Sequence, residues 1–468
     1  MSAKFAVEEI IEITGGRLAQ GMMPDGAGQI STDTRNISET DWYLAMSGEL
    51  YDGHNFLGDA YSAGALGAIV AERPSYPIAN NSFPLIAVED TLAAYQALAR
   101  AWRFKVSPAV VGVTGSSGKT TTKEMCASVF AASMRTHKSQ ANENNEVGVA
   151  KTILAMPADT EVLIIELAMR ARGEIAALTK IALPDVGIIV NAGVAHIGIL
   201  SSVDNIVAAK CELLEEMSTV GGVAVIGQQN ELLIARAQSV FGDRMLVWTP
   251  ESVRELQVTP EKTVFAVGAS EWCNKESKFS VRAHGLSQLQ DAWCAIMAAR
   301  ECGVDDESIA RGLMSYNPVS GRGTKLVAKC GCTVVDEAYN GNPDSVRSSV
   351  CSFVDERVFP QPEKYVVLGE LAELGQETDL LHRELGRWLR DKKLTALLTV
   401  GPVACHIAEG AEGAAFEVIA CQDQKEVEDA LRPRLTAQAC VLIKGSHCAN
   451  LDRLVATLVV PAVENCST

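Results

Sequence analysis

Short, continuous runs of apolar residues alternate along the chain with longer segments whose apolar residues have helical spacing. Continuous apolar runs are typical of strands that are buried on both faces of a sheet. The clearest runs lie at 109–114, 162–165, 186–190 and 222–226, and the helical segments between and after them include 119–132, 210–217 and 289–300. This alternation predicts an α/β fold, with helices on both faces of a parallel sheet.

The same pattern, over 468 residues, predicts about three domains. A short amphipathic helix at 7–13 and a strand at 68–71 indicate a small N-terminal α/β domain, residues 1–88. The strand–helix alternation then fills a central domain, residues 89–316. After the glycine-rich stretch 321–323 the alternation starts again, so we expect a hinge there and a third α/β domain, residues 317–468.

Charge and cysteine content exclude several classes of protein. The 58 Asp and Glu residues outnumber the 41 Lys and Arg residues, and the net charge of −17 opposes binding to nucleic acid or anionic membranes. The 13 cysteines contain no Cys-x-x-Cys pair, which favours reduced thiols. Acidic residues near the N-terminus do not fit a signal peptide, and the apolar stretch 181–200 contains Pro184 and Asp185. We therefore expect a cytoplasmic monomer that is not inserted into a membrane.

A phosphate-binding loop is the strongest local signal. Gly115-Ser116-Ser117-Gly118-Lys119-Thr120-Thr121 directly follows an apolar strand and directly precedes a helix. Small residues let backbone N–H groups point inward, and the positive end of the helix favours phosphate. The positive charge of the Lys119 side chain can attract the outer phosphates of a nucleotide, and the Thr120 hydroxyl can bind Mg²⁺. The loop is a shortened variant of the usual Gly-x-x-x-x-Gly-Lys-Ser/Thr motif, and it predicts nucleotide binding.

Polar residues at the ends of the next strands suggest a metal site. Glu166 ends one apolar run, and His196 follows the run after it. A hard cation takes oxygen ligands and tolerates an imidazole, so Thr120, Glu166 and His196 form a plausible set around phosphate-bound Mg²⁺. Lys210, by contrast, shares a predicted helix with two glutamates and by composition alone indicates a solvent-exposed helix face.

These residues together resemble a known family. The loop 114–121, the segment 142–149, Glu166, Asn191, His196 and Lys210 are similar to the central domain of the Mur ligases, the ATP-dependent amide-forming enzymes of peptidoglycan precursor assembly. The segments 31–35 and 52–54 resemble the UDP-sugar domain of the members that add the third and later residues. The segments 336–345 and 368–375 resemble the members that add D-alanyl-D-alanine, and 444–446 matches a late Lys-Gly-Ser element of the family.

The resemblance implies an activity and a set of ligands. It implies that D-alanyl-D-alanine is joined to a UDP-N-acetylmuramoyl-tripeptide with ATP and two Mg²⁺ ions, and that Lys119, Glu166, His196 and Lys210 are catalytic. Thr120 and Glu166 would bind one Mg²⁺, while His196 and a carbamylated Lys210 would bind the second. The nucleotide would contact Gly115, Ser116, Ser117, Gly118, Lys119, Thr120, Thr121, Asn142, Asp291, Arg322 and Asn340. The other substrates would contact Ser31, Thr32, Asp33, Thr34, Arg35, Asp52, His54, Asn144, Asn145, Tyr339, Asn342 and Lys444.

The chain departs from the family pattern near the nucleotide base. Ser287 stands where the family has His, and Asp291 stands where it has the Asn that contacts adenine. A carboxylate only accepts hydrogen bonds, so we expect the base to be held less tightly. Two alternatives stay open at this point. One is another amide ligase, of the diaminopimelate-adding, lysine-adding or folylpolyglutamate type, and the other is a non-catalytic nucleotide-binding descendant. The third residue of the tripeptide, diaminopimelate or lysine, is also open.

Overall fold

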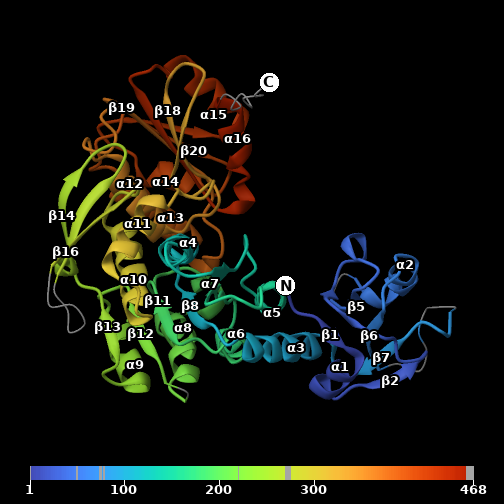
Figure 1. Ribbon diagram of the computed structural model, residues 1–468. Helices are drawn as coiled ribbons and strands as arrows, with labels where there is room; N and C mark the ends of the chain where they lie inside the picture. Colours follow the sequence, from blue (N-terminus) through green and yellow to red (C-terminus); the bar gives the residue numbers. More distant parts are fainter. Residues whose placement is uncertain are drawn as a thin grey trace, which may run out of the picture.

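The computed structural model describes residues 2–48, 51–72, 76, 80–219, 221–268 and 276–459. Figure 1 shows three units along the chain: an N-terminal unit in blue, a middle unit from cyan to yellow, and a C-terminal unit in orange and red. Helix α3 (Thr91–Val106) leads from the first unit into the second. No helix in these ranges is both long enough and apolar enough to cross a bilayer.

The N-terminal unit contains a small mixed sheet with the strand order β2-β7-β6-β5-β4. Strand β2 pairs antiparallel with β7, and the other neighbours pair in parallel. The predicted helix is α1, which ends where Gly15 adopts a φ of 67°. The strands of this unit are β1 (Phe5–Ala6), β2 (Arg17–Gln20), β3 (Ala27–Gly28), β4 (Ile30–Ser31), β5 (Trp42–Leu44), β6 (Gly67–Ala71) and β7 (Leu85–Val88), and its helices are α1 (Val7–Thr14) and α2 (Leu57–Ser62), with 3-10 turns η1 (Thr34–Asn36) and η2 (Gly53–Phe56).

The middle unit contains a fully parallel sheet with the strand order β13-β12-β11-β8-β10-β9. From β8 the chain runs to β9 at one edge of the sheet, returns to β10 between them, and then continues on the other side of β8 through β11, β12 and β13. Such a reversal of direction leaves a crevice beyond the carboxyl ends of the central strands. The strands are β8 (Ala109–Thr114), β9 (Thr136–Lys138), β10 (Val162–Glu166), β11 (Val186–Ile189), β12 (Val223–Ile226) and β13 (Met245–Val247).

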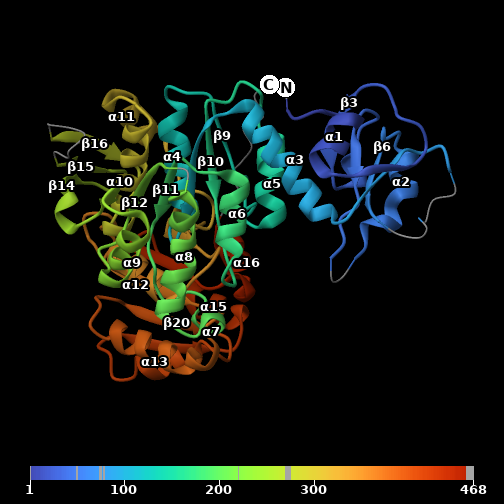
Figure 2. The same cartoon turned by 90° about the horizontal axis from the view of Figure 1, so that it is seen from below.

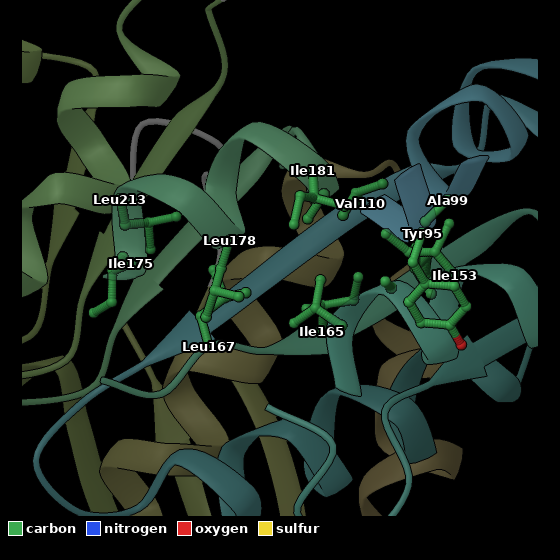
Figure 3. Packing of buried hydrophobic residues seen from close by; sticks show 14 of the residues in the cluster. Tyr95, Ala99, Val110, Ile153, Ile165, Leu167, Ile175, Leu178, Ile181 and Leu213 are labelled. Atoms are coloured by element: carbon green, nitrogen blue, oxygen red, sulfur yellow. The ribbon is translucent and has the colours of Figure 1, made fainter. Parts of the chain in front are cut away.

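Helices cover both faces of this sheet, as the apolar runs predict (Figure 2). Along β10, Leu163 and Ile165 join the core under one set of helices, while Val162 and Ile164 join the core on the opposite face. Figure 3 shows the first core, where Tyr95 of α3 and Ile153 of α5 pack close to Ile165. The helices of that face are α3, α5 (Glu146–Ala155), α6 (Glu174–Ala182), α8 (Val203–Met217) and α9 (Glu231–Phe241); those of the other face are α4 (Lys119–Ala131), α10 (Leu286–Glu301) and α11 (Asp306–Ser315).

A small antiparallel sheet that the sequence analysis did not predict follows the parallel one. Its strands are β14 (Val253–Val258), β15 (Thr263–Val267) and β16 (Ser277–Val281), after the turn η3 (Pro250–Ser252). Phe265 and Phe279 pack on each other with ring centroids 6.1 Å apart and join the core formed by α4, α10 and α11. The sheet therefore extends the middle unit toward the C-terminal one.

The C-terminal unit repeats the α/β pattern with the strand order β17-β18-β22-β19-β20-β21, in which only the edge pair β17–β18 is antiparallel. Gly321 and Gly323, at the predicted hinge, have φ values of 75° and 90°. The strands are β17 (Thr324–Val327), β18 (Thr333–Glu337), β19 (Glu363–Leu368), β20 (Ala396–Val400), β21 (Glu417–Cys421) and β22 (Ala439–Lys444). The helices are α12 (Pro343–Phe353), α13 (Thr378–Leu389), α14 (Cys405–Gly410), α15 (Gln424–Leu431) and α16 (Leu451–Leu458), with turns η4 (Gly375–Glu377), η5 (Arg432–Arg434) and η6 (His447–Ala449).

Candidate active site

The predicted phosphate loop follows β8, the strand at which the sheet changes direction. Gly118 ends the loop with a φ of 78°, a conformation that glycine adopts without strain. Asn191, after β11, fixes the loop from the side, because its Oδ1 accepts hydrogen bonds from the backbone N–H groups of Ser116 (3.0 Å) and Ser117 (2.9 Å). The N-terminal turn of α4 is thereby held in place with its amides at the crevice, where an anion is favoured.

Lys119 is the first residue of α4 and lines the crevice. Its Nζ donates a hydrogen bond to the carbonyl oxygen of Gly115 (2.8 Å), which folds the side chain back over the loop. Burial lowers the pKa of the Lys119 amine, and the negative charge of Glu166 acts in the opposite direction. A phosphate bound over this loop would be a negatively charged partner for the Lys119 amine.

Thr120 and Glu166, the predicted ligands of the first metal, are in direct contact. The Thr120 hydroxyl donates to Glu166 Oε2 (2.8 Å), and the Asn144 amide donates to Glu166 Oε1 (2.9 Å). Thr120 is 6% exposed and Glu166 is 3% exposed. A buried carboxylate with a hydroxyl oxygen beside it offers the oxygen ligands that Mg²⁺ prefers, so Thr120 and Glu166 fit a magnesium site.

Lys210 is not on a solvent-exposed helix face, so the interpretation from composition alone was wrong. Its side chain is 1% exposed, on the buried side of α8. Burial, together with the positive charge of Lys119, lowers the pKa of the Lys210 amine well below its ordinary value. A neutral amine is the form that reacts with carbon dioxide, so Lys210 fits carbamylation. Lys210 itself is not among the described residues that line the crevice.

The C-terminal unit supplies the opposite wall. The Arg322 guanidinium lies 4.2 Å from the centre of the Tyr339 ring, and the electron-rich face of the ring attracts its positive charge. Asp336 holds the hinge, because its Oδ2 accepts from the backbone N–H of Gly321 (2.9 Å). Lys444 Nζ donates to Glu337 Oε2 (2.8 Å) and to the Asn340 carbonyl oxygen (3.2 Å). This wall therefore presents the Arg322 guanidinium and a Lys444 amine that is already paired with Glu337.

Between these walls lies a cavity of about 590 Å³. It brings together predicted residues from both units: Ser116, Ser117, Gly118, Lys119, Thr120, Thr121, Asn142, Asn144, Asn145, Glu166, His196, Asp291, Arg322, Tyr339, Asn340, Asn342 and Lys444. None of the described residues lining it comes from the N-terminal unit, so the 31–35 and 52–54 segments form a separate surface in this arrangement.

Several of the predicted residues have structural contacts of their own. Asn145 and Asn342 cap helices α5 and α12 with their side chains. Asp291 lies beneath Gly118 and accepts a hydrogen bond from the Thr122 hydroxyl (2.9 Å), and burial raises the pKa of its carboxyl group to about 8. Its contact with adenine stays a prediction. Beside it, Gln288 and Lys325 also line the cavity, although the sequence analysis did not single them out.

The two N-terminal motifs are held by their own aspartates. Asp33 caps the turn η1 and pairs with Arg35 (2.8 Å), whose side chain is 86% exposed. His54 is fully buried; its Nδ1 lies 2.6 Å from Asp52 Oδ1, and its Nε2 accepts from the Ala71 N–H (2.9 Å). His54 therefore supports this surface from the interior, while the Arg35 side chain is exposed on it.

Comparisons with known proteins agree with this geometry. Residues 113–299 match the model of the Mur ligase middle domain, and residues 321–447 match that of the Mur ligase, glutamate ligase domain. The chain is 31% identical to the UDP-N-acetylmuramoyl-tripeptide--D-alanyl-D-alanine ligase of Bacillus subtilis, over 97% of this chain and 98% of that protein. It is 33% identical to the enzyme of the same name from Synechocystis, over 92% and 91%.

This chain belongs to the Mur ligase family.

Solved structures of the family share its architecture. A crystal structure of MurF from Acinetobacter baumannii superposes with a TM-score of 0.88 at 28% identity, covering 98% of this chain and 99% of that one. The MurF ligase from Thermotoga maritima, in complex with ADP, gives a TM-score of 0.80 at 27% identity, covering 92% and 96%. The prediction of a three-unit α/β Mur ligase is therefore confirmed.

In this Mur ligase, three polar residues that the sequence analysis named only as parts of motifs, without a role of their own, support the site. Asn191 fixes the phosphate loop, Asp336 fixes the hinge beside Arg322, and Glu373 reaches His196. A signal was available for Asn191 and Asp336, because each ends an apolar strand, and such positions meet at the carboxyl edge of a parallel sheet. Glu373 lies in the 368–375 motif, but its contact with His196 was not predictable, since the two residues are far apart in the sequence.

Proposed function

We propose that this Mur ligase joins D-alanyl-D-alanine to a UDP-N-acetylmuramoyl-tripeptide at the expense of ATP. The observation that carries the proposal is the shared cavity, where the phosphate loop of the middle unit faces Arg322 and Tyr339 of the C-terminal unit. The full-length similarity to D-alanyl-D-alanine ligases of this family supports the choice of substrates. The ADP in the Thermotoga maritima complex supports ATP as the nucleotide.

The reaction proceeds in two steps. The terminal carboxylate of the tripeptide attacks the γ-phosphorus of ATP, ADP leaves, and an acyl phosphate forms. The amine of D-alanyl-D-alanine then attacks the acyl carbon, loses a proton, and phosphate leaves with one of the original carboxylate oxygens. The amides of the α4 N-terminus and the Lys119 amine bind the phosphates and offset their charge, which is the main source of catalysis in phosphoryl transfer. Enclosure between the two units keeps water from the acyl phosphate.

Two metal positions accompany this chemistry. Thr120 and Glu166 bind one Mg²⁺, and His196 and a carbamylated Lys210 bind the second. Magnesium supplies positive charge that neutralises the phosphate oxygens and the attacking carboxylate. The Thr120 hydroxyl beside the buried Glu166 carboxylate and the lowered pKa of the Lys210 amine support this assignment.

The domains divide the substrates among them. Residues 1–88 bind the UDP end of the tripeptide substrate through 31–35 and 52–54, residues 89–316 bind ATP, and residues 317–468 bind the incoming dipeptide near Tyr339, Asn342 and Lys444. One chain supplies both walls of the cavity, which supports a monomer. The substrates place the enzyme in the bacterial cytoplasm, in peptidoglycan synthesis.

Phosphate release measured with each substrate omitted in turn tests the proposal. We expect release only when ATP, the UDP-tripeptide and D-alanyl-D-alanine are all present, with diaminopimelate and lysine tripeptides compared side by side. Replacement of the dipeptide by glutamate or diaminopimelate separates the proposal from the other amide ligases. Release that ignores the amino substrate, or no release with any combination, would contradict it.

A further inference from the structure

His196 and Glu373 meet across the junction of the middle and C-terminal units. His196 Nδ1 lies 2.6 Å from Glu373 Oε2. His196 begins α7 (Ile197–Leu200), which follows β11, whereas Glu373 lies between β19 and η4. Both residues have positive φ values, 64° and 65°, which are uncommon outside glycine. A backbone held in this uncommon conformation on both sides of a contact indicates that the surrounding structure fixes it there.

The backbone around the pair fixes its position. The Gly198 N–H donates to the Glu373 carbonyl oxygen (3.1 Å). A Cβ atom on Gly198 would lie 2.4 Å from the backbone nitrogen of Gly375, and one on Gly375 would lie 2.6 Å from Gly198 Cα. Only a pair of glycines permits this approach, so the carboxylate is brought to the imidazole by main-chain contacts rather than by a flexible side chain alone.

The two side chains line the same cavity as Lys119 and Glu166. Nδ1 of His196 is shielded from solvent and makes no hydrogen bond of good geometry within the described chain, and the charged group that faces it is the Glu373 carboxylate, with Oε2 at 2.6 Å. When a carboxylate faces one ring nitrogen, that nitrogen carries the proton and the other keeps its lone pair. A metal-binding histidine needs this form, and such carboxylate partners are common behind metal ligands.

We propose that Glu373 is a positioning residue that prepares His196 for the metal when the C-terminal unit closes on the middle unit. The inference rests on the proposed function, in which His196 is a metal ligand. Closure delivers the Glu373 carboxylate to Nδ1, and the imidazole then presents Nε2 as a ligand. Because coupling between binding sites is reciprocal, metal binding also favours closure. Glu373 thus links the movement of one unit to the metal site of the other.

The test is Mn²⁺ binding to the full-length protein, measured by electron paramagnetic resonance with the non-hydrolysable analogue AMPPNP. Glu373→Gln keeps the size of the side chain but removes its charge, and Glu377→Gln removes an exposed charge from the neighbouring turn η4 as the matched control. We expect E373Q to weaken Mn²⁺ binding by about tenfold or more, and E377Q to leave it unchanged. In the H196A background, E373Q should have no further effect.

A second readout separates positioning from a simple latch between the units. Small-angle X-ray scattering with AMPPNP reports how compact the protein is. If E373Q opens the molecule but leaves Mn²⁺ affinity unchanged, Glu373 is only a latch and the inference is overturned. It is also overturned if E373Q changes neither quantity, or if H196A leaves Mn²⁺ binding unchanged. None of these readouts needs turnover, so failure of the proposed function appears separately, in the phosphate-release assay.

Discussion

Thr120 donates its hydroxyl hydrogen bond to Glu166 over 2.8 Å, although the two residues come from different elements, the first turn of α4 and the end of β10. The contact exists because β8 and β10 are adjacent parallel strands whose carboxyl ends meet at one edge. The pair joins the phosphate loop to a buried carboxylate. A cation bound there would touch both the protein and the outer phosphates of a nucleotide.

Two substitutions at Thr120 separate the hydroxyl group from the shape of the side chain. Thr120→Val keeps the shape and loses the oxygen, whereas Thr120→Ser keeps the oxygen. We expect Thr120→Val to lower kcat/KM for ATP by about a hundredfold, and Thr120→Ser to stay within a few-fold of the parent. Steady-state kinetics at several Mg²⁺ concentrations provide the measurement. Equal activity in the two variants would exclude a metal role for this hydroxyl.

Lys119→Ala should abolish phosphate release while leaving the fold intact. The amine contacts the loop rather than the hydrophobic core, so its loss removes charge at the phosphates and costs about a hundredfold or more in rate. Thermal unfolding should change little. Lys278→Ala, at an exposed position on β16, serves as the control. A turnover number unchanged by Lys119→Ala would remove the loop from the mechanism.

The strands and the loop were predictable from the sequence because local patterns determine them. Buried parallel strands need continuous apolar runs, and the tight turn at Gly118 needs a residue that tolerates positive φ. The sheet β14–β16 was missed because polar residues interrupt its strands, as Arg254 and Glu255 interrupt β14. Its stability comes instead from packing against the helices of the middle unit.

The environment of Lys210 shows why some site residues could not be predicted. Its neighbour Glu212 suggested a solvated face, yet Glu212 is 5% exposed and accepts hydrogen bonds from the Gly173 (2.8 Å) and Ala176 (3.2 Å) N–H groups at the start of α6. A carboxylate that caps another helix looks, in sequence alone, like a surface charge. Burial of this kind depends on packing between helices that are distant in the chain.

Carbamylation of Lys210 can be observed directly. Burial lowers the pKa of its amine, so the neutral form that reacts with carbon dioxide is more populated than in an exposed lysine at the same pH. We expect a carbamate carbon resonance in the ¹³C spectrum of protein equilibrated with labelled bicarbonate. Lys210→Ala should lose both this signal and the ligase activity, and added short carboxylates should restore part of the activity. Lys180→Ala, an exposed lysine on α6, should keep both. A spectrum without the signal in the active parent protein would contradict carbamylation.

Asp291 should make stability depend on pH. Because burial raises its pKa to about 8, the folded protein holds a proton that the unfolded chain releases from about pH 4 upward. The free energy of unfolding therefore falls as the pH rises from about 4 to about 8, and it levels off above pH 8. We expect Asp291→Asn to be closest to the parent in stability at pH 5, and more stable by on the order of 1–3 kcal/mol at pH 8.

Urea unfolding at the two pH values measures this difference, with the exposed Asp391→Asn as the control. Equal destabilisation of Asp291→Asn at both values would mean that the carboxyl group is ionised and needed in that form. The same variant also tests the adenine contact. If the resemblance to the family holds at this position, KM for ATP falls by a few-fold to about tenfold above pH 8, where the Asp291 carboxyl group is ionised and can only accept, since one hydrogen bond is regained.

The most direct test of the central claim follows the oxygen atoms of the tripeptide. The UDP-tripeptide is prepared with ¹⁸O in both oxygens of the carboxylate that accepts the dipeptide, and is incubated with ATP and D-alanyl-D-alanine. Mass spectrometry should find one ¹⁸O in the released phosphate and one in the UDP-pentapeptide, because an acyl phosphate transfers a single carboxylate oxygen to phosphorus. Unlabelled phosphate without pentapeptide would show that the chain only hydrolyses ATP, and it would contradict the assignment as a ligase.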